Sequence, residues 1–188
     1  MGTLVVDIET ASPFEEPPKN SNATEYFEWF AVSLAYTDTL DEPPETEVLF
    51  RAGNWDESYT IDLYERLCEW CEKRTIDRVL TYNGTWFDGK HLLNWATDID
   101  ADIDREFRSQ IETLFENHID VALAAAEQYA DELWDDQQIL PDWKAYDRAG
   151  INNNSVWYED YNFPETYRSS IDDGAVTGKD IGRVLGGR

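Results

Sequence analysis

The chain has 188 residues, a length that predicts a single domain over residues 1–188. It has 40 Asp and Glu against 15 Lys and Arg, and its net charge of −25 is typical of a protein from a salt-loving (halophilic) organism. Eight Trp, ten Tyr and eight Phe supply enough apolar surface for a core, which excludes an intrinsically disordered chain. The sequence has neither a membrane-length apolar run nor a secretory leader, so we expect a cytoplasmic protein with no membrane partner.

Three strands are predicted in the N-terminal part of the chain. Residues 3–9, 27–37 and 46–51 are short, apolar and rich in β-branched or aromatic side chains. The loop over residues 11–25 is rich in Pro, Glu and Asn, and a double proline at residues 43–44 marks a turn. Three consecutive strands joined by turns predict an antiparallel meander.

After residue 60 the hydrophobic period changes, and helices alternate with short strands. Residues 134–170 show no regular period. This order predicts an α/β fold with a mixed sheet flanked by helices. The predicted elements are helices over residues 60–74, 87–97, 103–116 and 122–133, strands over residues 78–82 and 118–121, and a last short helix over residues 174–186.

Two carboxylates, Asp7 and Glu9, are separated by one residue in the first predicted strand and therefore lie on one face of it. Burying two unpaired carboxylates side by side is unfavourable, and hard divalent ions such as Mg²⁺ and Mn²⁺ prefer carboxylate oxygens. The pair therefore fits a metal site. It fits equally an acid that faces solvent at the end of a strand, which is common in so acidic a chain.

A second cluster of polar residues follows the strand predicted over residues 78–82. The sequence continues with Asn83-Gly84, a tight loop, and a helix that begins near Phe87-Asp88. Asp88 lies in the first helical turn, where the helix dipole favours an anion, and just beyond a strand end, where sheet proteins often build sites. A simple helix N-cap explains Asp88 alone equally well.

Together these segments resemble the first two motifs of the DEDD 3′–5′ exonucleases, which have a ribonuclease H-like fold. The closer resemblance is to predicted exonucleases related to the proofreading domain of family B DNA polymerases, and it covers most of residues 1–130. It implies that the mixed sheet is ribonuclease H-like. The segments that carry the resemblance are Asp7-Ile8-Glu9, Tyr82-Asn83-Gly84, Phe87-Asp88 with Leu92, and His118-Ile119-Asp120.

The resemblance implies hydrolysis of phosphodiester bonds in single-stranded or 3′-ended DNA or RNA by two Mg²⁺ or Mn²⁺ ions about 4 Å apart. Asp7 would bridge both ions, Glu9 would bind the ion that activates water, and Asp88 would hold the second ion. The missing basic patch argues little against a nucleic-acid partner, because counterion release is weak at high salt. The residues expected to contact the substrate are Thr10, Asn83, Trp86 and Phe87, although either aromatic side chain is equally compatible with a core position.

The third motif of this family, which supplies a fourth carboxylate, is not found. Either the chain lacks the last catalytic helix, in which case a partner chain could supply the acid, or the fourth ligand is divergent. The alternative function is a catalytically inactive ribonuclease H-like module that binds nucleic acid or protein. The candidates for a divergent fourth ligand are Asp172, Asp173, Asp180 and Asp120.

His118, Asp120 and the Cys68/Cys71 pair each have a structural interpretation. We expect His118 to be buried against a polar neighbour and Asp120 to cap the Ala-rich helix that follows, rather than to act as a ligand. Cys68 and Cys71 have the spacing of half a zinc site, but there is no second cysteine pair. We therefore expect both thiols on the buried face of a helix.

Overall fold

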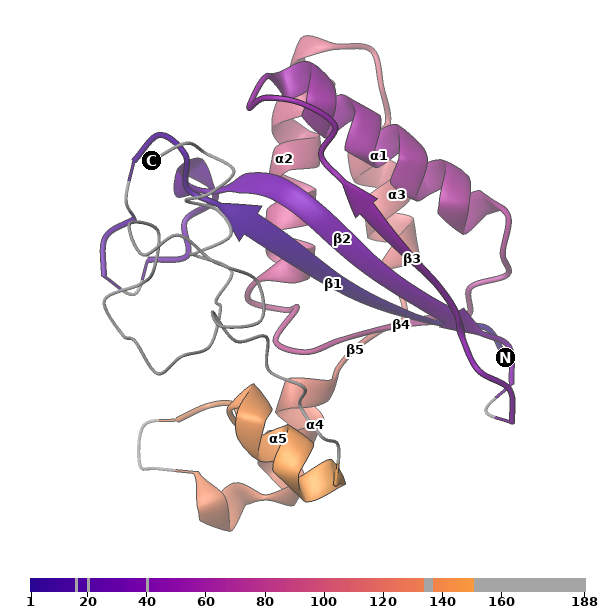
Figure 1. Cartoon of the computed structure of the whole chain (residues 1–188), viewed down its shortest axis with the longest axis vertical. Helices are drawn as coiled ribbons and strands as arrows, with labels where there is room; N and C mark the ends of the chain where they lie inside the picture. The colour runs from indigo at the N-terminus through magenta and orange to yellow at the C-terminus, as the bar shows by residue number, and fades with distance from the viewer. Residues whose placement is uncertain (16, 20, 40, 134–136, 151–188) are drawn as a thin grey trace, which may run out of the picture.

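The computed structural model describes residues 1–150 except residues 16, 20, 40 and 134–136. Five strands and five α-helices follow one another in this part of the chain (Figure 1). The strands are β1 (Thr3–Ala11), β2 (Glu28–Thr37), β3 (Glu45–Phe50), β4 (Arg78–Thr81) and β5 (His118–Asp120), and the helices are α1 (Glu57–Glu72), α2 (Asp88–Asp102), α3 (Phe107–Leu114), α4 (Val121–Gln128) and α5 (Asp142–Ala149), with 3-10 turns at Thr24–Tyr26 and Ala130–Glu132.

The strands form one mixed sheet in the order β3-β2-β1-β4-β5. Strands β1, β2 and β3 are antiparallel neighbours, as the predicted meander requires, while β4 and β5 run parallel to β1. This is the topology of a ribonuclease H-like α/β fold. The predicted fold class is therefore confirmed.

The predicted elements that fall within the described residues are present, but their ends differ, and α4 ends at Gln128, five residues before the predicted end. Helix α2 continues to Asp102, five residues beyond the predicted end, because Ile99 is buried against the sheet and extends the apolar stripe. Helix α5 lies in a region predicted to lack regular structure, and it ends at Gly150, which has a left-handed backbone. Its sequence is mostly polar, so the apolar period that identifies a helix is weak. The predicted helix over residues 174–186 lies outside the described residues.

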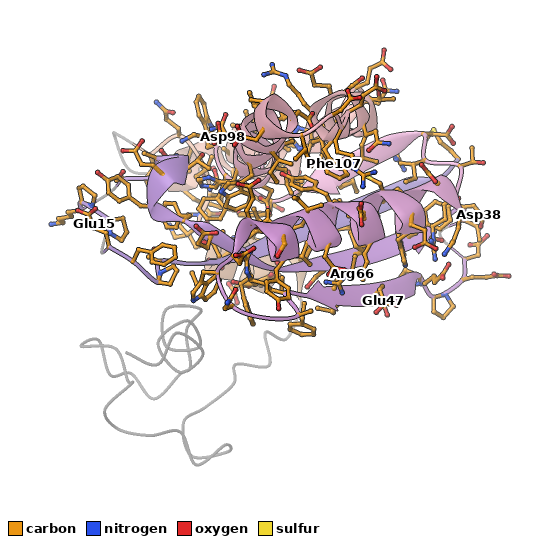
Figure 2. The ribbon with its side chains drawn as sticks, turned by 90° about the horizontal axis from the view of Figure 1, so that it is seen from above. Glu15, Asp38, Glu47, Arg66, Asp98 and Phe107 are labelled. Carbon is orange, nitrogen blue, oxygen red and sulfur yellow. The ribbon has the colours of Figure 1, made fainter. Side chains whose placement is uncertain are left out.

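The core lies between one face of the sheet and helices α1, α2 and α3, which Figure 1 shows together on one side of the strands. Leu4, Val6 and Ile8 alternate along β1 and point into it, each at most 4% exposed. Phe107, labelled in Figure 2, stacks on Tyr64 of α1 with ring centroids 5.1 Å apart. Burial of such side chains stabilises the fold by about 1.5–3 kcal/mol each.

The opposite face of the sheet is partly exposed. Asp7 pairs with Ser33 and Glu9 with Ala31 across β1 and β2, so these residues share the face that points away from the core. Val5 on the same face is 42% exposed and Phe50 on β3 is 54% exposed. The acids of β1 therefore lie on the accessible face of the sheet. None of the helices in the described part of the chain is long and apolar enough to span a membrane.

Candidate metal centre

Asp7 and Glu9 lie next to an irregularity in β1. The pairing register with β2 shifts between Glu9 and Thr10, so that Thr10 pairs with Trp29. Such bulges re-aim side chains and are common beside active sites. Both carboxylates are exposed to solvent at the surface, yet the protein around them partly desolvates them and raises the pKa of each, and the charge of Asp7 raises the pKa of Glu9 further.

Asp7, Glu9 and Asp88 are called the acid group below, and Asp88 is its buried member. It is 2% exposed, and its Oδ1 accepts a hydrogen bond of 2.8 Å from the backbone N–H of Ile8, the residue between Asp7 and Glu9. The helix N-cap interpretation is therefore wrong, because the cap position is Phe87 and the Asp88 carboxylate bonds across to β1. This bond ties a third carboxyl group to the strand backbone between Asp7 and Glu9.

Burial raises the pKa of Asp88 to about 7, and the negative charge of Asp7 adds to this effect. The N–H of Ile8 acts in the opposite direction, because it stabilises the charged form. In the described part of the chain no Lys or Arg forms a salt bridge with Asp7, Glu9 or Asp88. Asp7 therefore repels both Glu9 and Asp88 without a compensating cation from these residues.

The loop between β4 and α2 makes a tight turn. Asn83 has a φ of 66°, the left-handed conformation that Asn tolerates better than most residues. A Cβ atom on Gly84 would lie 2.1 Å from Oγ1 of Thr81, so only glycine fits there. The N–H groups of Trp86 and Phe87 both donate to the carbonyl of Asn83, which leads the chain into α2.

The two aromatic residues predicted to contact substrate lie in different places. Trp86 is 51% exposed and remains a candidate for stacking on a base. Phe87 packs edge-on against Phe27 and His91, with ring centroids 6.0 and 4.5 Å away. It is partly buried against the hydrophobic core. The substrate role of Phe87 is therefore not supported by its position.

Asp120 lies at the end of β5 and is 7% exposed. Its Oδ1 accepts the N–H of Ala122, as expected of a cap on α4, but the same carboxylate also accepts the N–H groups of Asn83 and Thr85. Burial alone would raise its pKa, yet these hydrogen bonds outweigh burial and lower it. Both oxygens are thus engaged by backbone donors, and we do not include Asp120 among the ligands.

His118 and Thr81 complete the surroundings of the loop. His118 is half-buried rather than buried as expected, but its Nε2 lies 2.7 Å from Oγ1 of Thr81, which confirms the expected polar neighbour. Burial lowers the pKa of His118, so the imidazole is held neutral. The sequence analysis missed Thr81, although a small polar residue just before an Asn-Gly turn is a signal that it could have used.

His91 is a buried histidine that the sequence did not single out as a site residue. It is 0% exposed, and its Nδ1 lies 2.9 Å from Oγ1 of Thr24 in the loop that follows β1. Burial lowers its pKa to about 4. Asn94 also bonds to Thr24, and Lys90 bonds to Asn22, so this loop is tied to α2, the helix that begins with Asp88.

The acid group fits a hard cation by its chemistry, since it offers only carboxylate oxygens whose mutual repulsion a divalent ion would relieve. In the arrangement that the structure describes, however, no group of three or more His, Cys, Asp or Glu side chains converges as a metal site. The acids would have to turn toward one another to hold an ion. The candidates Asp172, Asp173 and Asp180 lie outside the described residues.

Cys68 and Cys71 lie on α1 and are both partly buried against the core, as expected for structural thiols. Burial raises the pKa of Cys68 to about 11 and that of Cys71 to about 12. Protonated thiols are poor nucleophiles and poor metal ligands. A zinc or redox role for this pair is therefore not proposed.

Comparisons with known proteins give the following. No family model matches the chain, and no curated protein matches it. Among 18 matching chains of solved structures is the family B DNA polymerase from the hyperthermophilic archaeon Pyrobaculum calidifontis, with a TM-score of 0.40 and 17% sequence identity. The match covers 53% of this chain and 11% of the polymerase chain.

Proposed function

We propose that this protein is a metal-dependent 3′–5′ exonuclease that hydrolyses phosphodiester bonds of DNA or RNA. The observation that carries the proposal is the hydrogen bond from Ile8 N–H to Asp88, which ties the residue of the second acidic segment to the backbone between Asp7 and Glu9. These three residues are the acids of the two segments that resemble the first two motifs of the DEDD exonucleases. The chain's own fold supports the proposal, because its sheet has the ribonuclease H-like order.

Asp7, Glu9 and Asp88 would hold Mg²⁺ or Mn²⁺. When bound, two such ions would supply the Lewis acidity that activates a water and stabilises the leaving oxygen. Ile8 N–H fixes the orientation of the Asp88 carboxylate, and the exposed Trp86 offers a surface on which a terminal base stacks. Thr10 directly follows Glu9 in the chain and Asn83 precedes Asp88 by five residues, and both are proposed to position the strand end.

The test is hydrolysis of a 5′-labelled single-stranded oligonucleotide in molar KCl with Mn²⁺ or Mg²⁺. Stepwise shortening from the 3′ end, abolished by Asp7→Ala, would support the proposal. A matched control is Asp38→Ala, since Asp38 is exposed near the opposite end of β1 (Figure 2). Cleavage of a substrate with a blocked 3′ end would point instead to an endonuclease of the same fold.

A second candidate is an inactive ribonuclease H-like module that binds nucleic acid or a partner protein. The lack of a convergent three-ligand group in the described residues favours it. If Mn²⁺ raises the melting temperature of the wild type but not of Asp7→Ala, the protein binds metal through Asp7. This result would refute a module that binds no metal. If Mn²⁺ has no effect and no substrate is shortened, the exonuclease proposal fails. Activity that appears only with a second polypeptide would indicate that a partner chain supplies the missing acid.

A further inference from the structure

We propose that Asp120 is a positioning residue that holds the loop between β4 and α2, and through it Asp88, in place for metal binding. The inference rests on the proposed metal centre, but the contacts that motivate it belong to the polypeptide alone. They connect three separate parts of the chain: the end of β5, the loop, and the first turn of α2.

Side chains accept every backbone donor at the tip of this loop. The N–H of Asn83 donates to Asp120 Oδ1 at 2.9 Å, and the N–H of Thr85 donates to Asp120 Oδ2 at 2.9 Å. The intervening N–H of Gly84 donates to Thr81 Oγ1 at 3.1 Å. Successive N–H groups around a left-handed residue form a concave anion-binding site, and here the anion is the carboxylate of Asp120.

This arrangement explains how Asn83 keeps its φ of 66°. A left-handed conformation at a residue other than glycine is unfavourable and persists only where its surroundings enforce it. Two charge-assisted hydrogen bonds, donated by the N–H groups of Asn83 and Thr85 to one buried carboxylate, supply that constraint. Asp120 is 7% exposed, so water competes little for either oxygen.

The constraint extends to Asp88. The carbonyl of Asn83 accepts the N–H groups of Trp86 and Phe87, and the carbonyl of Gly84 accepts that of Gly89 at 2.8 Å. The loop therefore sets the first turn of α2, in which Asp88 is the first residue. Because Asp88 reaches β1 through a single hydrogen bond to Ile8, a shift of this turn would move its carboxylate away from Asp7.

We call the two hydrogen bonds from the N–H groups of Asn83 and Thr85 to Asp120 the clamp. The clamp is distinct from the helix cap that Asp120 also provides. The cap needs only the bond to the N–H of Ala122 at 3.1 Å. A serine at residue 120 would cap α4 about as well as aspartate but has one oxygen on a shorter side chain, so it would release Asn83 and Thr85. Asp120→Ser thus removes the clamp while keeping the cap, and Asp120→Asn keeps the shape but turns an amide N–H₂ toward a backbone donor.

The matched control is Asp100→Asn. Asp100 also accepts two backbone N–H groups, one on each oxygen, from Phe107 at 3.1 Å and Arg108 at 2.8 Å. It does so at the start of α3 rather than beside the acids. A general loss of stability should therefore appear in both aspartate-to-asparagine variants, whereas an effect on the acid group should appear only at Asp120.

The experiment measures Mn²⁺ affinity by electron paramagnetic resonance and amide hydrogen exchange of the metal-free full chain. We expect Asp120→Ser and Asp120→Asn to weaken Mn²⁺ binding about 10- to 100-fold, as second-layer changes at metal sites typically do, and Asp100→Asn to change it less than about 2-fold. We also expect faster exchange over residues 83–89 in the Asp120 variants alone.

Mn²⁺ affinity in both Asp120 variants equal to that of Asp100→Asn would overturn the positioning role. If the wild type binds no Mn²⁺, the proposed function fails, and the hydrogen-exchange data decide the clamp on their own. Unchanged exchange over residues 83–89 in a folded Asp120→Ser protein would then refute it.

Discussion

Asp88→Asn should stabilise the metal-free protein, although it alters the proposed centre. The Asp88 carboxyl is 2% exposed, and its charge is opposed by burial and by Asp7. An asparagine keeps an oxygen that can accept the N–H of Ile8 but carries no charge. The substitution therefore removes the repulsion and the desolvation of a charge while it keeps the hydrogen bond.

The size of the effect follows from the pKa of Asp88, which rises from 3.8 to about 7 on folding. The folded state binds this proton more tightly than the unfolded state, so the free energy of unfolding of the wild type decreases as pH rises from about 4 to about 7. The difference sets a ceiling of about 4 kcal/mol above pH 7. Because the amide also loses water on burial, we expect Asp88→Asn to gain about 1–3 kcal/mol at pH 8.

The assay is urea unfolding at fixed high salt with a chelator, at about pH 5 and about pH 8. The advantage of Asp88→Asn should be larger at the higher pH. The matched control is Asp98→Asn, since Asp98 is exposed on the same helix (Figure 2) and should give the same small change at both values. On addition of Mn²⁺ the order should invert, because the ion stabilises only the wild type.

Asp88→Asn that destabilises the metal-free protein equally at both pH values would refute this reasoning. It would mean that Asp88 is an ordinary ionised acid whose charge is compensated elsewhere in the chain. If the pH dependence appears but Mn²⁺ stabilises both proteins alike, the electrostatic account survives and the metal assignment fails.

Three further predictions follow from the charge and the packing. Molar KCl should raise the melting temperature, because screening relieves the repulsion of a net charge of −25; an unchanged melting temperature would contradict the halophilic interpretation. Phe87→Ala should lower the free energy of unfolding by about 2–4 kcal/mol, whereas Trp86→Ala, at a side chain that is 51% exposed, should change it by less than about 0.5 kcal/mol and instead raise KM for a single strand about 10-fold. Burial lowers the pKa of His91 to about 4, so the unfolded state binds more protons than the folded state between about pH 4 and 6.5. As pH falls through this range, the free energy of unfolding of the wild type should therefore decrease by up to about 3 kcal/mol relative to that of His91→Gln. A constant difference between the two proteins in urea unfolding at all pH values would refute this.

The strands and most helices could be predicted because their patterns are local. Alternation in β1 separates Leu4, Val6 and Ile8 from Asp7 and Glu9, and this alternation alone determines which residues face the core. The proximity of Asp88 to these acids could be anticipated only through the family resemblance, because the bond to Ile8 joins residues 80 positions apart. No sequence period encodes a contact of that kind.

Other features depend on tertiary contacts that the sequence does not disclose. Asp120 was expected to cap α4, which it does, but its bonds to Asn83 and Thr85 depend on β5 lying beside β4 in the sheet. Phe87 and Trp86 are adjacent aromatic residues with no local difference, yet only one of them packs against His91. The direction of a side chain at a loop–helix junction is set by the fold around it.

The contrast between the buried charges of this chain favours a cation among the acids. Arg51, 7% exposed, donates to the carbonyls of Trp29, Asn54 and Asp56 and to the hydroxyl of Thr60, and Asp120 accepts three N–H groups. Asp88 is equally buried, but among the described residues it has one backbone donor besides its own helix and an acid as its charged neighbour. Arg51 and Asp120 thus each have several hydrogen-bond partners, whereas the surroundings of Asp88 disfavour its charge. The simplest physical reason for placing Asp88 against Asp7 is a ligand that binds to both.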